Sequence, residues 1–256
     1  MRQWRDSRTL RSLNRLHLVV IVGLVCLRSG FELPLPADEA PAAGKQGDEQ
    51  LTPIGQFLTI SGTVDDAVLG RVSRAALALQ TRAQQEKRRG ILVVEIRPGS
   101  SPFHQILGLA RFLSSDVPAL TTVAYIPETL TGNHVVIALA CKEIVMHPDA
   151  GVGDIGLGKP LDPDEQPFVV NLVNRRHNRK LSEALVLGML DRKNELLWVT
   201  VTQGKEPNTS RESRVVSRAT LDDLRNAGAV IDRVETLKHP DAPGVFTGKT
   251  AQSYNI

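Results

Sequence analysis

Apolar residues follow two different spacings along the chain, and these spacings predict strands and helices in turn. Short apolar runs, typical of strands buried on both faces of a parallel sheet, cover 57–60, 91–96, 119–125 and 143–146. Between them, apolar residues recur at helical spacing and predict helices over 65–85, 103–113 and 133–141. The order strand, helix, strand is typical of a βαβ unit with a right-handed crossover, so the pattern predicts an α/β fold with a parallel sheet.

The second half of the chain predicts smaller elements. Helices are expected over 164–179, 182–189 and 220–227, strands over 196–201 and 229–234, and a polar loop over 204–213. The first of these helices ends in the basic residues Arg175, Arg176, Arg179 and Lys180. Such a cluster either stabilises the carboxyl end of the helix or meets a neighbouring subunit or anionic lipid headgroups.

Residues 117–158 form the segment around which the other elements are expected to be arranged. A strand ends near Tyr125, a turn follows at 127–132, and a short buried helix begins beside it, with Asn133 or Thr131 as its N-cap. A second short strand then leads into a glycine-rich turn at 151–158. A strand end, a tight turn and a helix N-terminus beside a glycine-rich loop can hold an oxyanion or a peptide carbonyl.

Charge and composition divide the chain into three parts. The net charge is +3, but five arginines precede the apolar run 16–27, so the remainder is close to neutral and nothing favours nucleic acid. That run has the length of a signal-peptide core and is shorter than the roughly 20 residues of a membrane span. We therefore expect a signal peptide or signal anchor at 1–30, a flexible linker rich in Pro, Ala and Gly at 31–50, and one domain at 51–256.

Cysteine usage argues against a disulfide. Cys26 belongs to the apolar amino-terminal run, which leaves Cys141 as the other thiol and predicts that it is a small core residue. No metal-ligand set and no cofactor motif are predicted.

The central segment resembles the ClpP-class serine proteases, and within that class the membrane-associated NfeD branch. The resemblance lies in Tyr-Ile-Pro at 125–127, Ala-Leu-Ala-Cys at 138–141, Glu-Ile-Val-Met-His-Pro at 143–148 and the glycine-rich turn, and it covers about 57–190. It implies a ClpP/crotonase-like ββα spiral, a serine nucleophile at the start of the apolar helix, and a lysine base further on. Phe-Thr-Gly at 246–248 resembles the start of a late helix in these proteases, so the chain, which stops at Ile256, is expected to be truncated.

The resemblance places an oxyanion hole and a nucleophile on particular residues. Pro98-Gly99 match the oxyanion loop of the family, where Ser100 replaces a second glycine. The position of the nucleophilic serine falls on Gly132, which has no side chain. Thr131 is a neighbouring hydroxyl, and it is either an altered nucleophile or a helix cap.

Two histidines and the missing lysine complete the candidate site. His134 either faces the pocket or is a hydrogen-bonded structural residue. His147, in a Met-His-Pro context, either resembles the catalytic histidine of the ClpP branch or is a turn residue. No lysine stands at the expected place of the base, because Lys159 comes too early and Lys180 too late.

These observations predict an exported or membrane-anchored ClpP/NfeD-like peptidase homologue with an altered or lost nucleophile. Its partners would be a peptide or membrane-protein substrate and further copies of itself. The alternatives are a non-catalytic peptide-binding or assembly module and, less well matched to an export signal, a crotonase-type acyl-CoA enzyme. If the resemblance holds, Gly99 and Ser100 lie beside the start of the 133–141 helix, and Thr131, His134 and His147 surround one cavity.

Overall fold

The structure is a computed structural model that describes residues 52–175, 180–203 and 210–256. The expected leader (1–30) and linker (31–50) lie outside these ranges. The described residues all belong to one compact unit, Glu49–Ile256. Within them, no helix has both the length and the apolar character that a membrane crossing requires.

A four-stranded parallel sheet forms the centre of the domain and confirms the predicted α/β class. Its order is β1-β2-β3-β5, and every neighbouring pair is parallel. The strands are β1 (Ile54–Ile60), β2 (Gly90–Ile96), β3 (Leu120–Ile126) and β5 (Glu143–Met146). Because the strands run the same way in register, their carboxyl ends, and the loops that follow them, meet at one edge of the sheet.

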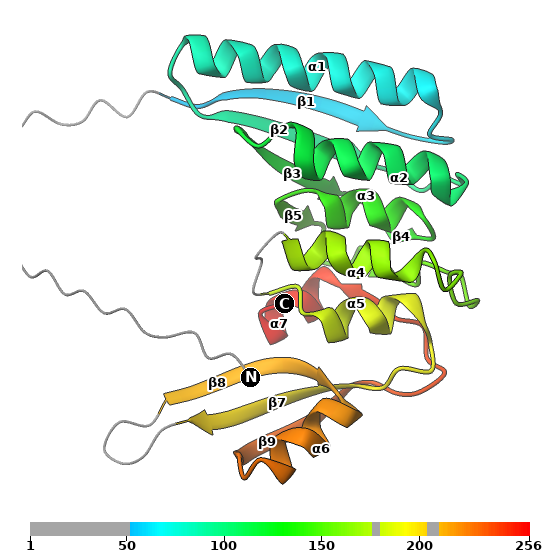
Figure 1. Cartoon of the computed structure of the whole chain (residues 1–256), viewed down its shortest axis with the longest axis vertical. Coiled ribbons are helices and arrows are strands. Elements are labelled where there is room, and N and C mark those ends of the chain that lie inside the picture. The colour runs from blue at the N-terminus through cyan, green and yellow to red at the C-terminus, as the bar shows by residue number, and fades with distance from the viewer. Residues whose placement is uncertain (1–51, 176–179, 204–209) are drawn as a thin grey trace, which may run out of the picture. The chain divides into compact units, whose positions relative to one another are not determined.

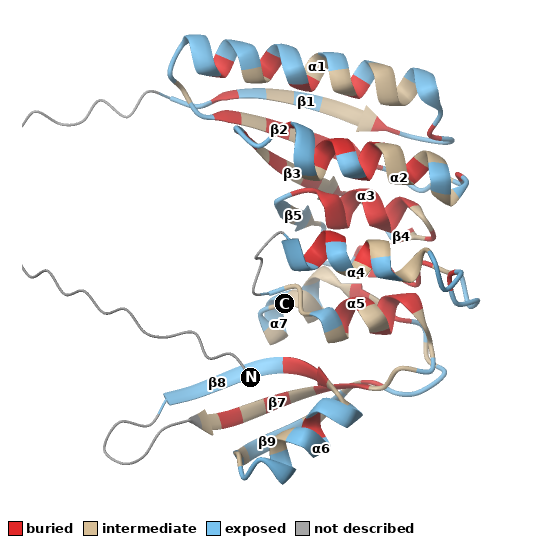
Figure 2. Ribbon diagram, viewed as in Figure 1, coloured by how far each residue is buried: buried red, intermediate tan, exposed pale blue. Residues whose placement is uncertain are grey.

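A row of helices runs along the domain, beginning over one face of this sheet and continuing beyond its last strand (Figure 1). They are α1 (Asp66–Gln85), α2 (Phe103–Arg111), which continues into the π-helical turn η1 (Phe112–Asp116), α3 (His134–Ala140), α4 (Gln166–Arg175) and α5 (Glu183–Leu190). Helix α3 is buried at every position, and buried residues elsewhere lie on the sides of helices and strands that face one another (Figure 2). Cys141 has no exposed surface, which confirms its predicted place in the core.

A second, three-stranded sheet makes the fold a ββα spiral. Its order is β10-β6-β4, with β4 (Leu130–Thr131), β6 (Gly151–Gly153) and β10 (Val245–Thr247). The chain passes through β3, β4 and α3, and then through β5, β6 and α4, so each turn contributes one strand to each sheet and then a helix. This repeat confirms the predicted ββα spiral.

The carboxyl-terminal part adds an antiparallel sheet with its own small core. Its order is β8-β7-β9, and its members are β7 (Leu196–Gln203), β8 (Ser210–Ser217) and β9 (Val230–Lys238). Helix α6 (Arg218–Asn226) packs Leu221 onto Leu197 and Val199 of β7. The last element is the short helix α7 (Gly248–Tyr254), where Tyr254 packs edge-on against Trp198 of β7.

Candidate active site

The loop that follows β2 meets the beginning of α3, as the predicted site requires. The Asn133 side-chain amide donates to the backbone oxygen of Ser101 at 2.9 Å. A methyl group on Gly99 would lie 2.3 Å from Cε1 of His134, so only glycine allows this close approach. The two segments are over 30 residues apart in sequence, and they meet because β2 and β3 are parallel neighbours whose carboxyl ends share one edge.

Ser101 and His134 form a buried hydrogen-bonded pair at this junction. Ser101 Oγ lies 3.0 Å from Nε2 of His134, and His134 Nδ1 lies 3.1 Å from the backbone oxygen of Arg97. A carbonyl oxygen can only accept, so Nδ1 carries the proton and Nε2 is the acceptor. The Ser101 hydroxyl therefore donates to Nε2, and its oxygen in turn accepts the backbone N–H of Val64 at 2.8 Å.

Burial holds His134 in the neutral form. The side chain is fully buried, and desolvation lowers its pKa, while the hydrogen bond to the Arg97 backbone opposes this shift without cancelling it. A neutral imidazole with a free lone pair directed at a serine hydroxyl is the arrangement of a general base beside a nucleophile.

Ser101 also lines a pocket of about 280 Å³ between the loop, α3 and the glycine-rich turn. The walls include Gly99, Ser100, Gly132 and Asn133, which brings the predicted oxyanion residues and the predicted nucleophile position to one place. Within the described residues, the N–H groups of Gly99 and Ser100 make no hydrogen bond. Their role as oxyanion donors stays a prediction.

The start of α3 offers no nucleophile of its own. Gly132 has φ +72°, a conformation that a serine would adopt only at a cost, and a side chain there would contact Leu157. Asn133 occupies the N-cap position but makes no capping hydrogen bond with its side chain, because its amide is directed to Ser101 instead. Of the two predicted N-caps, Asn133 and Thr131, the structure thus has Asn133 at this position.

None of the three predicted catalytic residues lines this pocket, and His134 reaches it only through its contact with Ser101. Thr131 belongs to β4, where it pairs with Gly153, and it does not line the cavity. His147 is exposed, and its Nδ1 accepts the backbone N–H of Asp149 at 3.3 Å. The expectation that Thr131, His134 and His147 surround one cavity is wrong. Strand β5 ends beside α7, so the backbone of His147 lies against Gly248.

Sequence reasoning missed Ser101 and set Lys159 aside. Ser101 belongs to the run Pro-Gly-Ser-Ser-Pro. The family resemblance assigns a role to its neighbour Ser100, which replaces a glycine, and none to Ser101. Lys159 was judged too early for the family's base, yet it lines the pocket together with Asp162 and Glu165. Within the described residues, no three His, Cys, Asp or Glu side chains are placed to hold a metal ion.

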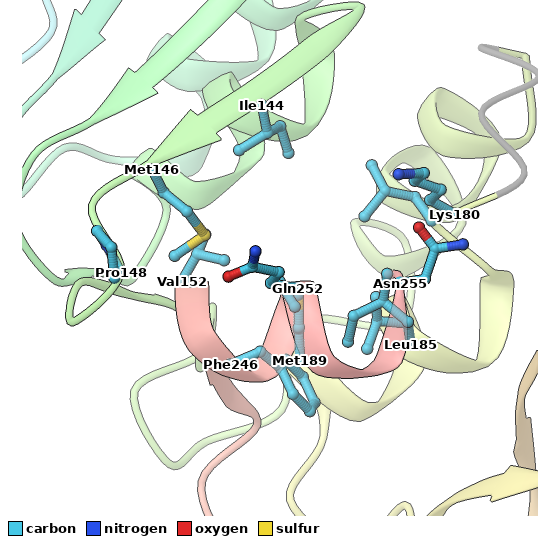
Figure 3. A pocket seen from close by; sticks show the side chains of 14 residues that line it. Ile144, Met146, Pro148, Val152, Lys180, Leu185, Met189, Phe246, Gln252 and Asn255 are labelled. Atoms are coloured by element: carbon cyan, nitrogen blue, oxygen red, sulfur yellow. The ribbon is translucent and has the colours of Figure 1, made fainter.

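A second, apolar pocket of about 420 Å³ lies beside β5, between α5 and α7 (Figure 3). Its apolar lining includes Met146, Val152, Met189 and Phe246, and the amide of Gln252 points into it. The sheet order ends at β5, so the outer edge of this strand is unpaired in the part of the chain that the structure describes.

No family model matches the chain, and no curated protein matches it. Among solved structures, it is similar to the ClpP protease catalytic domain from Plasmodium falciparum, with TM-score 0.37 and 10% identity over 53% of this chain and 73% of that one. It is also similar to ClpP1 from Listeria monocytogenes, with TM-score 0.38 and 12% identity over 53% of this chain and 78% of that one. At these scores the likeness assigns neither an activity nor a substrate to this chain.

Proposed function

We propose that the protein is a ClpP-type serine hydrolase homologue of the NfeD-like branch, in which the nucleophile has moved from the start of α3 to the loop after β2. The observation that carries this proposal is the 3.0 Å contact between His134 Nε2 and the Oγ of Ser101, a residue that lines a pocket. The position expected for the serine is Gly132, which lines the same pocket. An altered nucleophile thus accounts for the absence of a serine at position 132. It also accounts for the hydrogen bond between His134 and Ser101.

The proposed reaction is acyl transfer to Ser101 followed by hydrolysis. Ser101 Oγ would attack the carbonyl carbon of an ester or peptide, and its proton would pass to Nε2 of His134. The same Nε2 would then give the proton to the leaving alcohol or amine as the tetrahedral intermediate collapses. Water would attack the acyl group with His134 again as base. Throughout, the Nδ1–H bond to the Arg97 backbone oxygen would keep the ring in one tautomer and orientation.

A fluorophosphonate probe tests this assignment directly, because it reacts covalently with activated serines and not with ordinary ones. We expect the folded protein to be labelled once, at Ser101, and the urea-unfolded protein not at all. The labelled residue is identified by mass spectrometry of the digested protein. Labelling at another serine, or the same slow labelling before and after unfolding, would remove the proposal.

A non-catalytic peptide-binding module is the second candidate, and two observations favour it. Ser101 is only 6% exposed and His134 is fully buried, so their contact also serves to tie the loop to α3. In addition, the apolar pocket beside the unpaired edge of β5 offers what an extended apolar peptide needs, namely free backbone groups and a place for a side chain. Absence of probe labelling together with measurable binding of such a peptide would favour this candidate over the first.

We also propose that the protein is held in or exported across a membrane and that its copies associate. The first part rests on the basic and apolar amino-terminal run, and the second on the sheet face opposite the helices, where Phe57 is 56% and Val145 is 51% exposed. We expect an epitope-tagged chain to be recovered in the envelope fraction of its cells. A short amine-reactive reagent should cross-link one copy of the chain to another. Recovery as an uncross-linked cytosolic chain contradicts both parts.

A further inference from the structure

A third pocket, of about 680 Å³, lies at the opposite ends of the helices from Ser101, over the carboxyl end of α3. It exists because α3 stops at Ala140, whereas α2 with η1 and α4 continue on either side of it. The short helix leaves a hollow between its two longer neighbours. Ala140, Phe168 and the buried Leu172 form the apolar part of its lining.

Polar groups line this hollow from both flanking helices. On the α2 side they are Arg111, Ser114 and Ser115, and on the α4 side they are Asn171 and Arg175. The spacing of four residues places Asn171 and Arg175 on one face of α4. Arg111 ends α2, and Ser114 and Ser115 lie in the turn η1 that continues it, so the two sets line the hollow from its two sides.

Charge in the lining is predominantly positive. The pocket contains Arg111, Lys142 and Arg175 against a single carboxylate, Asp116. Lys142 Nζ is occupied by the backbone oxygens of Pro118 and Leu120. Neither guanidinium makes an ion pair with a carboxylate among the described residues. Basic residues at helix ends offset the helix dipole, but that role does not require two of them to face one pocket.

Arg111 is also held in place. Its guanidinium lies 5.4 Å from the centre of the Phe168 ring, which belongs to the same pocket. A guanidinium packed over an aromatic face loses less freedom when it binds, and its planar fork matches the oxygens of a phosphate. Arg175 on the opposite side, with Asn171 and Ser115 as neutral donors, could bind the remaining oxygens.

We infer that this hollow binds a phosphate group through Arg111 and Arg175. The group would belong either to a soluble phosphate ester or to the headgroup of an anionic lipid, since the same contacts serve both. The inference does not depend on the proposed hydrolase activity, because none of these residues takes part in the Ser101 pocket.

The test uses the full chain and its Arg111→Gln/Arg175→Gln double variant, with Arg74→Gln as a control for loss of an exposed arginine outside the pocket. Binding of inorganic phosphate and pyrophosphate is measured by calorimetry at constant ionic strength. Binding to vesicles of phosphatidylglycerol, and of phosphatidylcholine as a neutral comparison, is measured by flotation. We expect each glutamine to weaken phosphate binding by about tenfold, as loss of a hydrogen bond to a charged group does.

The outcomes separate the two sources of phosphate. Binding of the soluble anions that is lost in the double variant supports a phosphate ester, and flotation with phosphatidylglycerol alone that is lost in the double variant supports a lipid headgroup. Absence of binding in both assays overturns the inference. An equal loss in Arg74→Gln also overturns it, because the attraction would then be a matter of net charge. Because Arg111 packs on Phe168, the exposed Arg175→Gln is also tested alone, and wild-type affinity in that variant counts against the site.

Discussion

Replacing Ser101 with alanine is expected to lower ester and peptide hydrolysis by about a thousandfold or more, since what remains after loss of a nucleophile is binding and oxyanion stabilisation. The matched control is Ser253→Ala, an exposed serine on α7 whose hydroxyl donates to the backbone oxygen of Lys249. It should retain full activity. Initial rates with an activated ester and with fluorogenic apolar peptides supply the measurement.

Ser101 also has a structural role, so the alanine variant alone does not suffice. Its hydroxyl satisfies both the Val64 N–H and His134 Nε2, and removing a buried partner costs about 1–3 kcal/mol of folding free energy. Ser101→Cys separates the two roles, because a thiol beside His134 keeps the size and becomes a reactive nucleophile. We expect iodoacetamide to modify Cys at 101 much faster than the buried Cys141, and equal, slow rates would contradict a catalytic pocket.

The pH dependence of the same reaction reports on His134. Its pKa is lowered by burial, so it remains a competent base below the usual value of about 6.5, and the acidic limb of kcat/KM should have its midpoint below that value. The free energy of unfolding also depends on pH, because the unfolded chain binds a proton that the folded chain resists. The contribution of His134 to stability is therefore complete above about pH 6.5 and declines as the pH falls from there towards the folded-state pKa. A midpoint at or above 6.5 would contradict the assignment.

The strands of the parallel sheet could be predicted from the sequence because burial between the layers of the fold requires apolar residues along them. β2 and β5 appear within one residue of their predicted bounds, since both are short apolar runs between charged turns. The start of α1 could also be predicted, because Asp65 is an N-cap whose carboxylate accepts the N–H of Val68 at 2.8 Å.

Strand β8 could not be predicted, because its stability comes from a partner strand and not from its own composition. Ser210–Ser217 is polar except for Val215 and Val216, and its first five residues are exposed. The sequence therefore predicts a loop over 204–213, of which 204–209 lie outside the described residues. Pairing with β7 over eight positions supplies the backbone hydrogen bonds that hold this edge strand in place.

The meeting of the 97–102 loop with α3 could be predicted from topology, whereas the contact within it could not. Parallel neighbours bring Gly99 towards Gly132 whatever the side chains are. Which hydroxyl reaches His134 depends on the path of a turn that contains two adjacent serines between two prolines. Ser100 and Ser101 are equivalent in composition, and only the backbone conformation of the turn directs Ser101 to the imidazole.

Replacing Lys238 with methionine is expected to cost the domain about 3 kcal/mol or more of its free energy of unfolding. Lys238 ends β9 and is 4% exposed, and its Nζ donates to the backbone oxygens of Arg192 and Asn194, each at 2.6 Å, and of His239 at 3.4 Å. Arg192 and Asn194 belong to the connection between α5 and β7, so this one ammonium group joins the end of the antiparallel sheet to the segment that leads into it.

Methionine has a similar length but no donors, so the carbonyl oxygens would lose their partner, at about 1–3 kcal/mol for each one that stays buried. Lys193→Met is the matched control, because Lys193 is exposed on the same connection, and it should change stability by less than about 0.5 kcal/mol. Denaturant unfolding of both variants gives the difference. Equal stabilities would mean that water replaces the ammonium group and that the antiparallel sheet is held to the parallel one by its apolar contacts alone, among them Leu196 against Gly188 of α5.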